Sequence, residues 1–491
     1  MKLLWFHLMP YTELPDDFRE RHNSVWVDID SGLLDPTVAH RLYNEFMDEL
    51  EYAAALGFDA ICVNEHHANG YGLMPSPNLI AAALARRTSD AAICVLGNSL
   101  ALYNPPTRVA EEMAMIDCIS GGRLIAGFPV GTPMDTCFAY GQNPSMLRAR
   151  YIEAHDLVLE AWTRRETFAF NGRFNQLRYV NTWPHPVQKP RPPIWIPGGG
   201  SVETWQWCAA MDYVYCYLSY FGYKAGRETM MGFWREMERL GKDRNPYRAG
   251  FLQFVGVAQT REEAMKLYKE PAEYFYGRCL HVDSRYVNPP GYNSEATQRA
   301  RITSQVALAS QRAATMSGGA TWDEILAKGF VIIGSPDEVA AQLREVATDL
   351  NVGHLMVLQQ FGNMSRDLAQ LRLDLVGRAD DDEALGEDLV PTGAARHRRG
   401  ALRGERHLRC DARTLRRFAV VAGRVDIAAV DMEAATVEIL RRLLVELHRL
   451  VARLGDADEL QEAGAVGVAV LAEPLHLAPE PHHGLAPGLV T

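Results

Sequence analysis

Three titratable residues in a row, Glu65, His66 and His67, follow a short apolar run that predicts a buried strand. Imidazole changes charge near neutral pH, so a histidine of this triplet could act as a general acid or base, or stabilise a developing anion. Alternatively, one of these adjacent side chains faces a ligand while the others bond locally. A metal site has less support, because no His-x-His or His-x-x-x-His pair and no strand-end Asp cluster accompanies the triplet.

A second segment that could do chemistry is Gly198-Gly199-Gly200-Ser201, which stands between an apolar run and a helical pattern. Glycines let backbone N–H groups approach an anion closely, and the start of a helix adds its positive dipole. Ser201 or Thr204 could add a hydroxyl group. The alternative is a flexible turn with a helix N-cap. After a strand of an α/β protein, the segment favours a phosphate-bearing cofactor.

Strands and helices must position these residues. Up to about residue 377, the sequence alternates short apolar runs with helical patterns. The expected strands are Leu3–Leu8, Ala60–Val63, Ala92–Leu100, Leu124–Phe128, Ile194–Pro197, Tyr213–Leu218, Phe251–Ala258 and His354–Gln359. The expected helices are Pro36–Leu56, Asn78–Arg87, Thr107–Ser120, Arg148–Thr163, Gly226–Leu240, Arg261–Lys269 and Pro336–Leu350. Eight such strands predict an α/β fold, best a (β/α)8 TIM-like barrel. A doubly wound sheet is the alternative, but no Gly-x-Gly-x-x-Gly follows the first strand.

A barrel of this kind carries its active site on the loops that follow the strands. The triplet follows the second expected strand and the glycine run follows the fifth, so we expect both at one mouth. Before the last strand, the insertion Tyr276–Ala327 is too long for an ordinary connection and predicts a lid or extra helices. His7 either lines the pocket or is a core histidine, and the second is the commoner situation.

The composition is that of a globular protein of 491 residues with 50 basic and 61 acidic residues and a net charge of −11. This balance argues against a dedicated nucleic-acid binder and against attraction to anionic membranes. The eight cysteines contain no Cys-x-x-Cys pair, so we expect free thiols in a cytoplasmic protein. The apolar start, Leu3–Met9, is too short to span a membrane and predicts a buried strand instead of a signal peptide.

The composition changes abruptly near the C-terminus. Residues 379–491 contain no Lys, Ser, Asn, Tyr or Trp but 14 Arg. We therefore divide the chain into a barrel domain, residues 1–377, and an anomalous C-terminal tail, residues 378–491. Two interpretations of the tail stay open: a GC-rich gene read in a shifted frame, or an appended, partly helical or disordered interaction segment built on the amphipathic run Ala434–Leu454. We expect no catalysis from it in either case.

Four segments resemble the bacterial luciferase-like flavin-dependent monooxygenase family. They are FDAICVNEHH at 58–67, YNPPTRVAEEMAMIDCISGGRLIAGF at 103–128, PHPVQKPRPPIWIPGGGS at 184–201, and GSPDEVAAQLREV with VGHLMVLQQFG between 334 and 362. Together they extend over nearly all of residues 1–370, and the second is the most specific. The family normally ends with a last barrel helix soon after Leu371, and the tail does not resemble it, which favours the shifted-frame interpretation.

The resemblance implies a TIM-like barrel that binds reduced FMN supplied by a separate NAD(P)H-dependent flavin reductase. Oxygen would add to the flavin to form a C4a-(hydro)peroxyflavin, which oxygenates a small, apolar or carbonyl-containing organic substrate. Such an intermediate needs a dry pocket, or it collapses to hydrogen peroxide. The resemblance also implies a homodimer, or a higher homo-oligomer, through the helices after the second and third strands.

Carried over position by position, the resemblance assigns catalysis to His66, with Glu65 and His67 as its supporting neighbours. The cofactor-binding positions that it implies are Gly97, Asn98, Tyr151, Gly199, Gly200, Ser201 and Thr204. In the family, the turn that aligns with Gly97-Asn98 often holds a non-prolyl cis bond and contacts the flavin ring. The counterpart of Tyr151 reaches the flavin phosphate in some members.

Two positions depart from the family pattern. Val130 stands where luciferases have an arginine after the fourth strand, and Leu147 stands where some relatives pair a histidine with the counterpart of Tyr151. The phosphate would then rely on backbone amides, hydroxyl groups and either Arg148 or Arg150. This predicts weaker retention of FMN.

Three other functions stay open. The same fold could use a deazaflavin for hydride transfer, bind flavin without catalysis, or hydrolyse a substrate with a bound metal. The Glu-His-His triplet favours the oxygenase over the first two. A wall formed by Met134, Phe138 and Tyr140 suggests an apolar substrate pocket.

Overall fold

A computed structural model describes residues 1–131, 135–283, 286, 295 and 314–365 of the chain. The tail, including Ala434–Leu454, lies outside the described residues, as do Met134 and most of the insertion before the last strand. The domain boundary and both interpretations of the tail therefore stay predictions.

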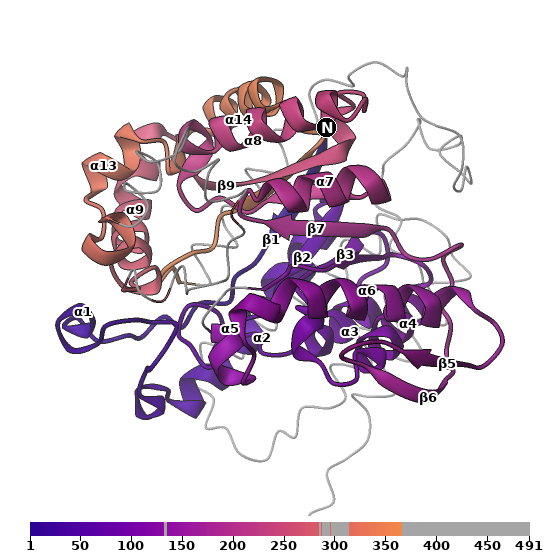
Figure 1. Cartoon of the computed structure of the whole chain (residues 1–491). Helices are drawn as coiled ribbons and strands as arrows, with labels where there is room; N and C mark the ends of the chain where they lie inside the picture. Colours follow the sequence, from indigo (N-terminus) through magenta and orange to yellow (C-terminus); the bar gives the residue numbers. More distant parts are fainter. Residues whose placement is uncertain (132–134, 284–285, 287–294, 296–313, 366–491) are drawn as a thin grey trace, which may run out of the picture. The chain divides into compact units, whose positions relative to one another are not determined.

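The described chain forms a closed barrel of eight parallel strands, which confirms the predicted (β/α)8 TIM-like fold. The ring runs β9-β11-β1-β2-β3-β4-β7-β8, and β8 pairs with β9 to close it. Figure 1 shows these strands at the centre, with helices on both sides. The barrel strands are β1 (Lys2–Phe6), β2 (Ala60–Val63), β3 (Ala92–Leu96), β4 (Leu124–Gly127), β7 (Ile194–Gly198), β8 (Val214–Tyr217), β9 (Ala249–Val257) and β11 (His354–Leu358).

The helices surround the barrel, and all seven expected ones are present, with ends shifted by zero to five residues. They are α2 (Pro36–Ala55), α3 (Pro77–Arg87), α4 (Thr107–Ser120), α6 (Leu147–Thr163), α8 (Gly222–Arg239), α9 (Arg261–Tyr274) and α14 (Pro336–Leu350). Helix α7 (Val202–Met211) follows the glycine run, and the short helices are α1 (Phe18–Arg21), α5 (Asp135–Ala139) and α13 (Trp322–Ala327). None of the helices in the described part of the chain is long and apolar enough to cross a bilayer.

Local signals explain where several helices begin and end. Pro36 opens α2, and the Asp35 carboxylate before it accepts a hydrogen bond from a first-turn amide. Ser335 and Glu338 form a capping box at the start of α14. Gly121 ends α4 with a φ of 71°, a left-handed conformation that glycine adopts at little cost.

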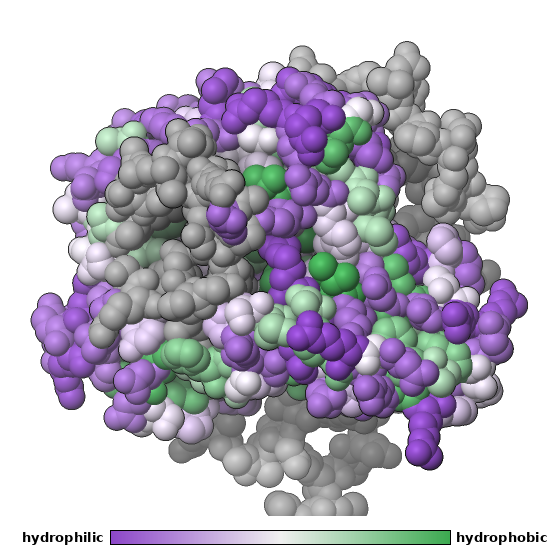
Figure 2. Space-filling view, viewed as in Figure 1, coloured by the Kyte–Doolittle hydropathy of each residue, from purple (hydrophilic) through white to green (hydrophobic). Residues whose placement is uncertain are grey.

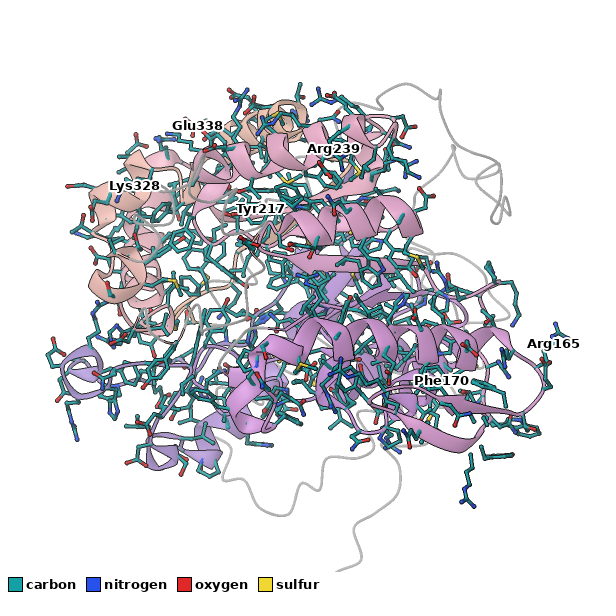
Figure 3. The ribbon with its side chains drawn as sticks, in the orientation of Figure 1. Arg165, Phe170, Tyr217, Arg239, Lys328 and Glu338 are labelled. Carbon is teal, nitrogen blue, oxygen red and sulfur yellow. The ribbon has the colours of Figure 1, made fainter. Side chains whose placement is uncertain are left out.

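Three strands lie outside the expected pattern. The hairpin β5 (Phe168–Asn171) and β6 (Gln176–Val180) lies at one edge of the molecule, where Figure 3 shows Phe170. Its turn is held by the Glu153 carboxylate, which accepts hydrogen bonds from three consecutive backbone amides beginning at Arg173. Strand β10 (Val331–Gly334) pairs with the far end of β9. Strands β5 and β6 are largely exposed and lack a continuous apolar run. Strand β10 is buried and contains the short apolar run at residues 331–333, which the sequence analysis did not assign to a strand.

The barrel interior is closely packed and apolar. Tyr217 lies among the strands in Figure 3 and is 2% exposed, whereas the labelled charged side chains lie at the periphery. Figure 2 shows that the same face is largely hydrophilic at its rim, with apolar side chains nearer its middle. The seven cysteines in the described residues are free thiols, and burial raises the pKa of Cys94 and Cys216. These two thiols therefore stay protonated and pack as small apolar groups.

A pH-dependent loss of stability is expected from His354, at the start of β11. Burial lowers the pKa of its imidazole to about 4, against an ordinary value of 6.5. Above pH 6.5 the side chain is neutral in both states and contributes nothing. Below pH 6.5 the unfolded chain binds a proton that the folded chain does not. The unfolding free energy then falls by at most about 1.4 kcal/mol per pH unit until the folded pKa is reached.

The measurement is urea unfolding of the wild type and of His354→Gln at several values between pH 7 and pH 4. The variant should lose less stability than the wild type as the pH falls, because it lacks this proton uptake. His40→Gln, on the exposed side of α2, should follow the wild type. Parallel profiles for all three proteins would contradict the expectation.

Candidate active site

A cavity of about 270 Å³ lies at the carboxyl ends of the barrel strands. It joins both segments that the sequence singles out, since Glu65, His66, Gly199 and Ser201 all line it. The other lining residues are Trp26, Asn64, Tyr71, Leu96, Gly97, Ser99, Pro129, Val130, Gly131, Arg148, Pro197, Gly198, Glu203, Thr204, Leu218 and Tyr220. The predicted convergence of the triplet and the glycine run at one barrel mouth is therefore confirmed.

The Glu65 carboxylate is held by three hydrogen-bond donors, and its side chain is 1% exposed. Oε1 lies 2.6 Å from Nε2 of His67 and 3.2 Å from the hydroxyl of Tyr103, while Oε2 accepts from the backbone N–H of Ser99 at 2.8 Å. Burial, with the nearby Glu65, raises the pKa of Tyr103 well above its usual range, so its hydroxyl stays a donor. Glu65 thus links the loop after β2 to the loop after β3.

The two histidines of the triplet face different surroundings. His66 lines the cavity, and its ring meets the Tyr71 ring edge-on with centroids 4.6 Å apart. His67 is 5% exposed and is absent from the lining, and its Nδ1 lies 3.3 Å from the Tyr140 hydroxyl. Because a carboxylate oxygen can only accept, Nε2 donates to Glu65, while Nδ1 lies beside the Tyr140 hydroxyl. One histidine faces the cavity while the other bonds locally.

The turn after β3 approaches the triplet closely at Gly97. A Cβ on this residue would lie 2.5 Å from the backbone N of Glu65, so only glycine fits. Asn98 is fully buried behind the cavity wall, and its Nδ2 donates to the Tyr103 hydroxyl at 3.3 Å. All cis peptide bonds among the described residues precede prolines, so the non-prolyl cis bond frequent in the family at this turn is not found here.

The glycine run leads into the N-terminus of α7. Ser201 is the N-cap, and its Oγ accepts a hydrogen bond from the Thr204 backbone N–H at 3.2 Å. The Arg148 guanidinium donates to the same oxygen at 3.1 Å. A Cβ on Gly199 would meet nothing within 4 Å, which leaves its backbone open to a ligand. Gly200 has a φ of 98° and is not among the lining residues.

Several expected cofactor contacts lie away from the cavity. Tyr151 is fully buried, and its hydroxyl donates to the backbone carbonyl of Phe128 at 2.5 Å. Arg150 places its guanidinium over the Phe174 ring, 5.0 Å from the centroid. Of the two arginines that the sequence offers for an anion, only Arg148 lines the cavity. Val130 also lines it, and Leu147 is buried.

Two further sequence expectations concern histidine and the apolar wall. His7 is a core residue, as expected: it is fully buried, its Nε2 lies 3.0 Å from Glu49 Oε2, and its Nδ1 accepts from the Met9 backbone N–H. Phe138 and Tyr140 are 57% and 41% exposed and do not line the cavity. Within the described ranges, no group of three or more His, Cys, Asp or Glu side chains is placed to hold a metal ion.

The structure also reveals lining residues that the sequence analysis did not single out. Asn64 precedes the triplet, Trp26 comes from the loop after β1, and Tyr71 follows the triplet. Tyr71 packs against Tyr220, which belongs to an aromatic-rich stretch that the sequence offers as the wall for a flat ligand. The position of Asn64 directly before Glu65, at a strand end, is a signal that could have identified it. Nothing in the local sequence distinguishes Trp26 from the other tryptophans.

Comparisons with known proteins agree with this geometry. The family model described as luciferase-like monooxygenase matches residues 29–352. Over 270 residues the chain is 28% identical to an uncharacterized protein of Sinorhizobium fredii, covering 54% of this chain and 77% of that protein. Over 167 residues it is 31% identical to the oxygenase component of a flavin-dependent trigonelline monooxygenase of Acinetobacter baylyi, covering 33% of this chain and 45% of the relative. The matched region thus spans under half the length of that second relative.

Solved structures share the fold at low sequence identity. The oxygenating constituent of 3,6-diketocamphane monooxygenase from Pseudomonas putida, in complex with FMN, has a TM-score of 0.59 at 16% identity, covering 78% of this chain and 99% of that chain. An F420-dependent secondary alcohol dehydrogenase has a TM-score of 0.52 at 14% identity, covering 77% and 97%. At these identities the likeness shows the barrel architecture alone.

Proposed function

Because the chain belongs to the luciferase-like monooxygenase family, we propose that it is the oxygenase component of a two-component, flavin-dependent monooxygenase. It would use reduced FMN and O2 to oxygenate a small organic substrate. The observation that carries this proposal is a single cavity lined both by His66 and by the glycine run with Arg148. An imidazole, which can serve as a general acid or base, and an anion-binding segment thus face the same space.

The residues around the glycine run fit a flavin phosphate. Ser201 and Thr204 offer hydroxyl groups, Gly199 leaves its backbone open, and Arg148 brings a positive charge to Ser201. The start of α7 adds the positive end of its dipole. Reduced FMN bound there would supply the electrons that activate O2. Gly97 lets the β3 turn approach the Glu65 backbone closely, and this turn lines the cavity in which the flavin ring would lie.

The residues of the triplet would have different roles in the reaction. The His66 imidazole lines the cavity and would hold or transfer a proton there. Glu65 and His67 would act as positioning residues, since their hydrogen bonds link the β2 and β3 loops and extend to Tyr140. The aromatic wall of Trp26, Tyr71 and Tyr220 would exclude water from the reaction.

Reduced flavin would come from a separate NAD(P)H-dependent reductase, and the similarity to an oxygenase component in Acinetobacter baylyi supports this partner. A homodimer through α3 and α4 is the expected assembly. It is supported by three apolar side chains exposed on these helices, namely Leu79, Met115 and Ile119.

The first test is anaerobic binding of reduced FMN, riboflavin and F420 to the full chain. We expect FMN to bind more tightly than riboflavin, because only FMN carries the phosphate. Arg148→Ala should weaken FMN binding about tenfold or more, as expected for a hydrogen bond to a charged group, and leave riboflavin binding unchanged. Arg150→Ala is the matched control and should alter neither. Preferential binding of F420 would favour hydride transfer without oxygen.

The same experiment continues with oxygen. The chain loaded with reduced FMN is mixed rapidly with oxygenated buffer while the flavin spectrum is recorded. A delay before the oxidised spectrum returns is the expected result, since the aromatic wall of Trp26, Tyr71 and Tyr220 would keep water from the reacting flavin. Immediate reoxidation with stoichiometric hydrogen peroxide would contradict the oxygenase proposal and favour a flavin-binding protein without catalysis.

A further inference from the structure

Asn64 is a buried side chain at the cavity wall whose polar atoms find no protein partner. It directly follows β2, lines the cavity and is 3% exposed. Within the described residues, neither Oδ1 nor Nδ2 accepts or donates a hydrogen bond. Its neighbour Glu65 differs, since that carboxylate is held by three donors. A carboxamide buried in this way bears a desolvation cost that a ligand with matching groups would remove.

Trp26 presents a second group of the same kind in the same cavity. The residue comes from the loop between β1 and α2, is 9% exposed and lines the cavity. Its indole Nε1 has no hydrogen-bond acceptor within the described part of the chain. An indole N–H can only donate, whereas a carboxamide both donates and accepts. Together the two residues offer two donors, Asn64 Nδ2 and Trp26 Nε1, and one acceptor, Asn64 Oδ1, next to Nδ2.

The surroundings restrict the shape of a matching ligand. Trp26 and Tyr71 meet edge-to-face with centroids 5.3 Å apart, and Tyr71 and Tyr220 do so at 5.7 Å. An aromatic wall of this kind favours a flat ligand. The Asn64 backbone is also fixed, because the place for a Cβ on Gly97 lies only 3.2 Å from the Asn64 carbonyl carbon. The carboxamide can therefore reorient only by rotation about its own side-chain bonds.

We propose that Asn64 and Trp26 form a polar subsite for a planar edge that carries a carbonyl beside an N–H, as in a lactam or an imide. Asn64 Nδ2 donates to the carbonyl while Oδ1 accepts from the N–H, and Trp26 Nε1 donates to a further acceptor. Two ligands could supply such an edge: the pyrimidine ring of the flavin, or the oxygenated substrate. The proposal deepens the function proposed above and rests on it for this choice of ligands.

The test uses pairs of ligands that differ only by a methyl group on the nitrogen. FMN is compared with 3-methyl-FMN, and 2-pyridone with 1-methyl-2-pyridone, each by calorimetric binding to the full chain. Pyridone binding is measured with and without bound FMN. In the wild type, methylation of the matched ligand should weaken binding about tenfold, because it removes the hydrogen that Oδ1 accepts. This part needs no variant, so it is independent of any folding defect.

Asn64→Leu should abolish the discrimination against the methylated ligand, and Asn44→Leu, on the exposed side of α2, should retain it. Discrimination within the FMN pair identifies the flavin as the ligand, and discrimination within the pyridone pair alone identifies the substrate. Equal binding within both pairs by the wild type overturns the subsite. If no flavin binds at all, the proposed function fails, while the pyridone pair still decides on Asn64.

Discussion

Replacing His66 by alanine is expected to shorten the delay between mixing with oxygen and return of the oxidised flavin spectrum by about 100-fold or more, within the range for loss of an acid–base group. The physical reason is that His66 is the one histidine of the triplet that lines the cavity. FMN affinity should stay within about threefold of the wild type, because the glycine run and Arg148, which would bind the phosphate, are unchanged.

The control and the outcome against this expectation are both well defined. His40→Ala removes an imidazole from the exposed side of α2 and should leave the delay unchanged. The hydrogen peroxide released per flavin should rise in His66→Ala and not in the control. An unchanged delay in a folded, FMN-binding His66→Ala protein would remove this residue from the chemistry. The search for a proton donor would then move to other groups that line the cavity.

Replacing Glu65 by alanine is expected to lower the free energy of unfolding by about 3–5 kcal/mol, as for a buried pair that loses one partner. Its carboxylate accepts from His67, Tyr103 and the Ser99 backbone, and all three donors would be left unpaired in a buried place. Glu65→Gln should lower the unfolding free energy by less than Glu65→Ala does, because the amide keeps one acceptor oxygen. It should still destabilise the protein, because its NH2 group faces a hydrogen-bond donor. Chemical denaturation of both variants measures the effect.

Two further variants distinguish loss of the specific Glu65 contacts from non-specific destabilisation. Tyr103→Phe should destabilise the wild type more than it destabilises Glu65→Ala. In that variant the bond from Tyr103 to Glu65 is already lost, and only the bond from Asn98 Nδ2 remains to be removed. Glu45→Ala breaks an exposed pair with Arg41 on α2 and should cost no more than about 1 kcal/mol. Additive effects of Glu65→Ala and Tyr103→Phe would show that the hydroxyl and the carboxylate are not coupled, against the geometry observed.

The barrel could be predicted because its signals are local. The apolar runs Ala60–Val63 and His354–Gln359 match β2 and β11 closely, and Pro336–Leu350 is α14 to the residue. Short-range periodicity and helix-terminal residues such as Ser335 depend on neighbours only a few positions away. The sequence does not reveal the β5–β6 hairpin, because its strands are largely exposed and an exposed strand needs no continuous apolar run.

The sequence by itself therefore determined the fold, the strand ends that carry the site, and the family. Only the tertiary structure decided that His66 faces the cavity while His67 turns to Glu65, and that Arg148 reaches the glycine run while Arg150 does not. The physical reason is distance along the chain. Glu65 is oriented by groups 34 and 38 residues away, and His67 by one 73 residues away. Side-chain directions set by such contacts appear in no local pattern.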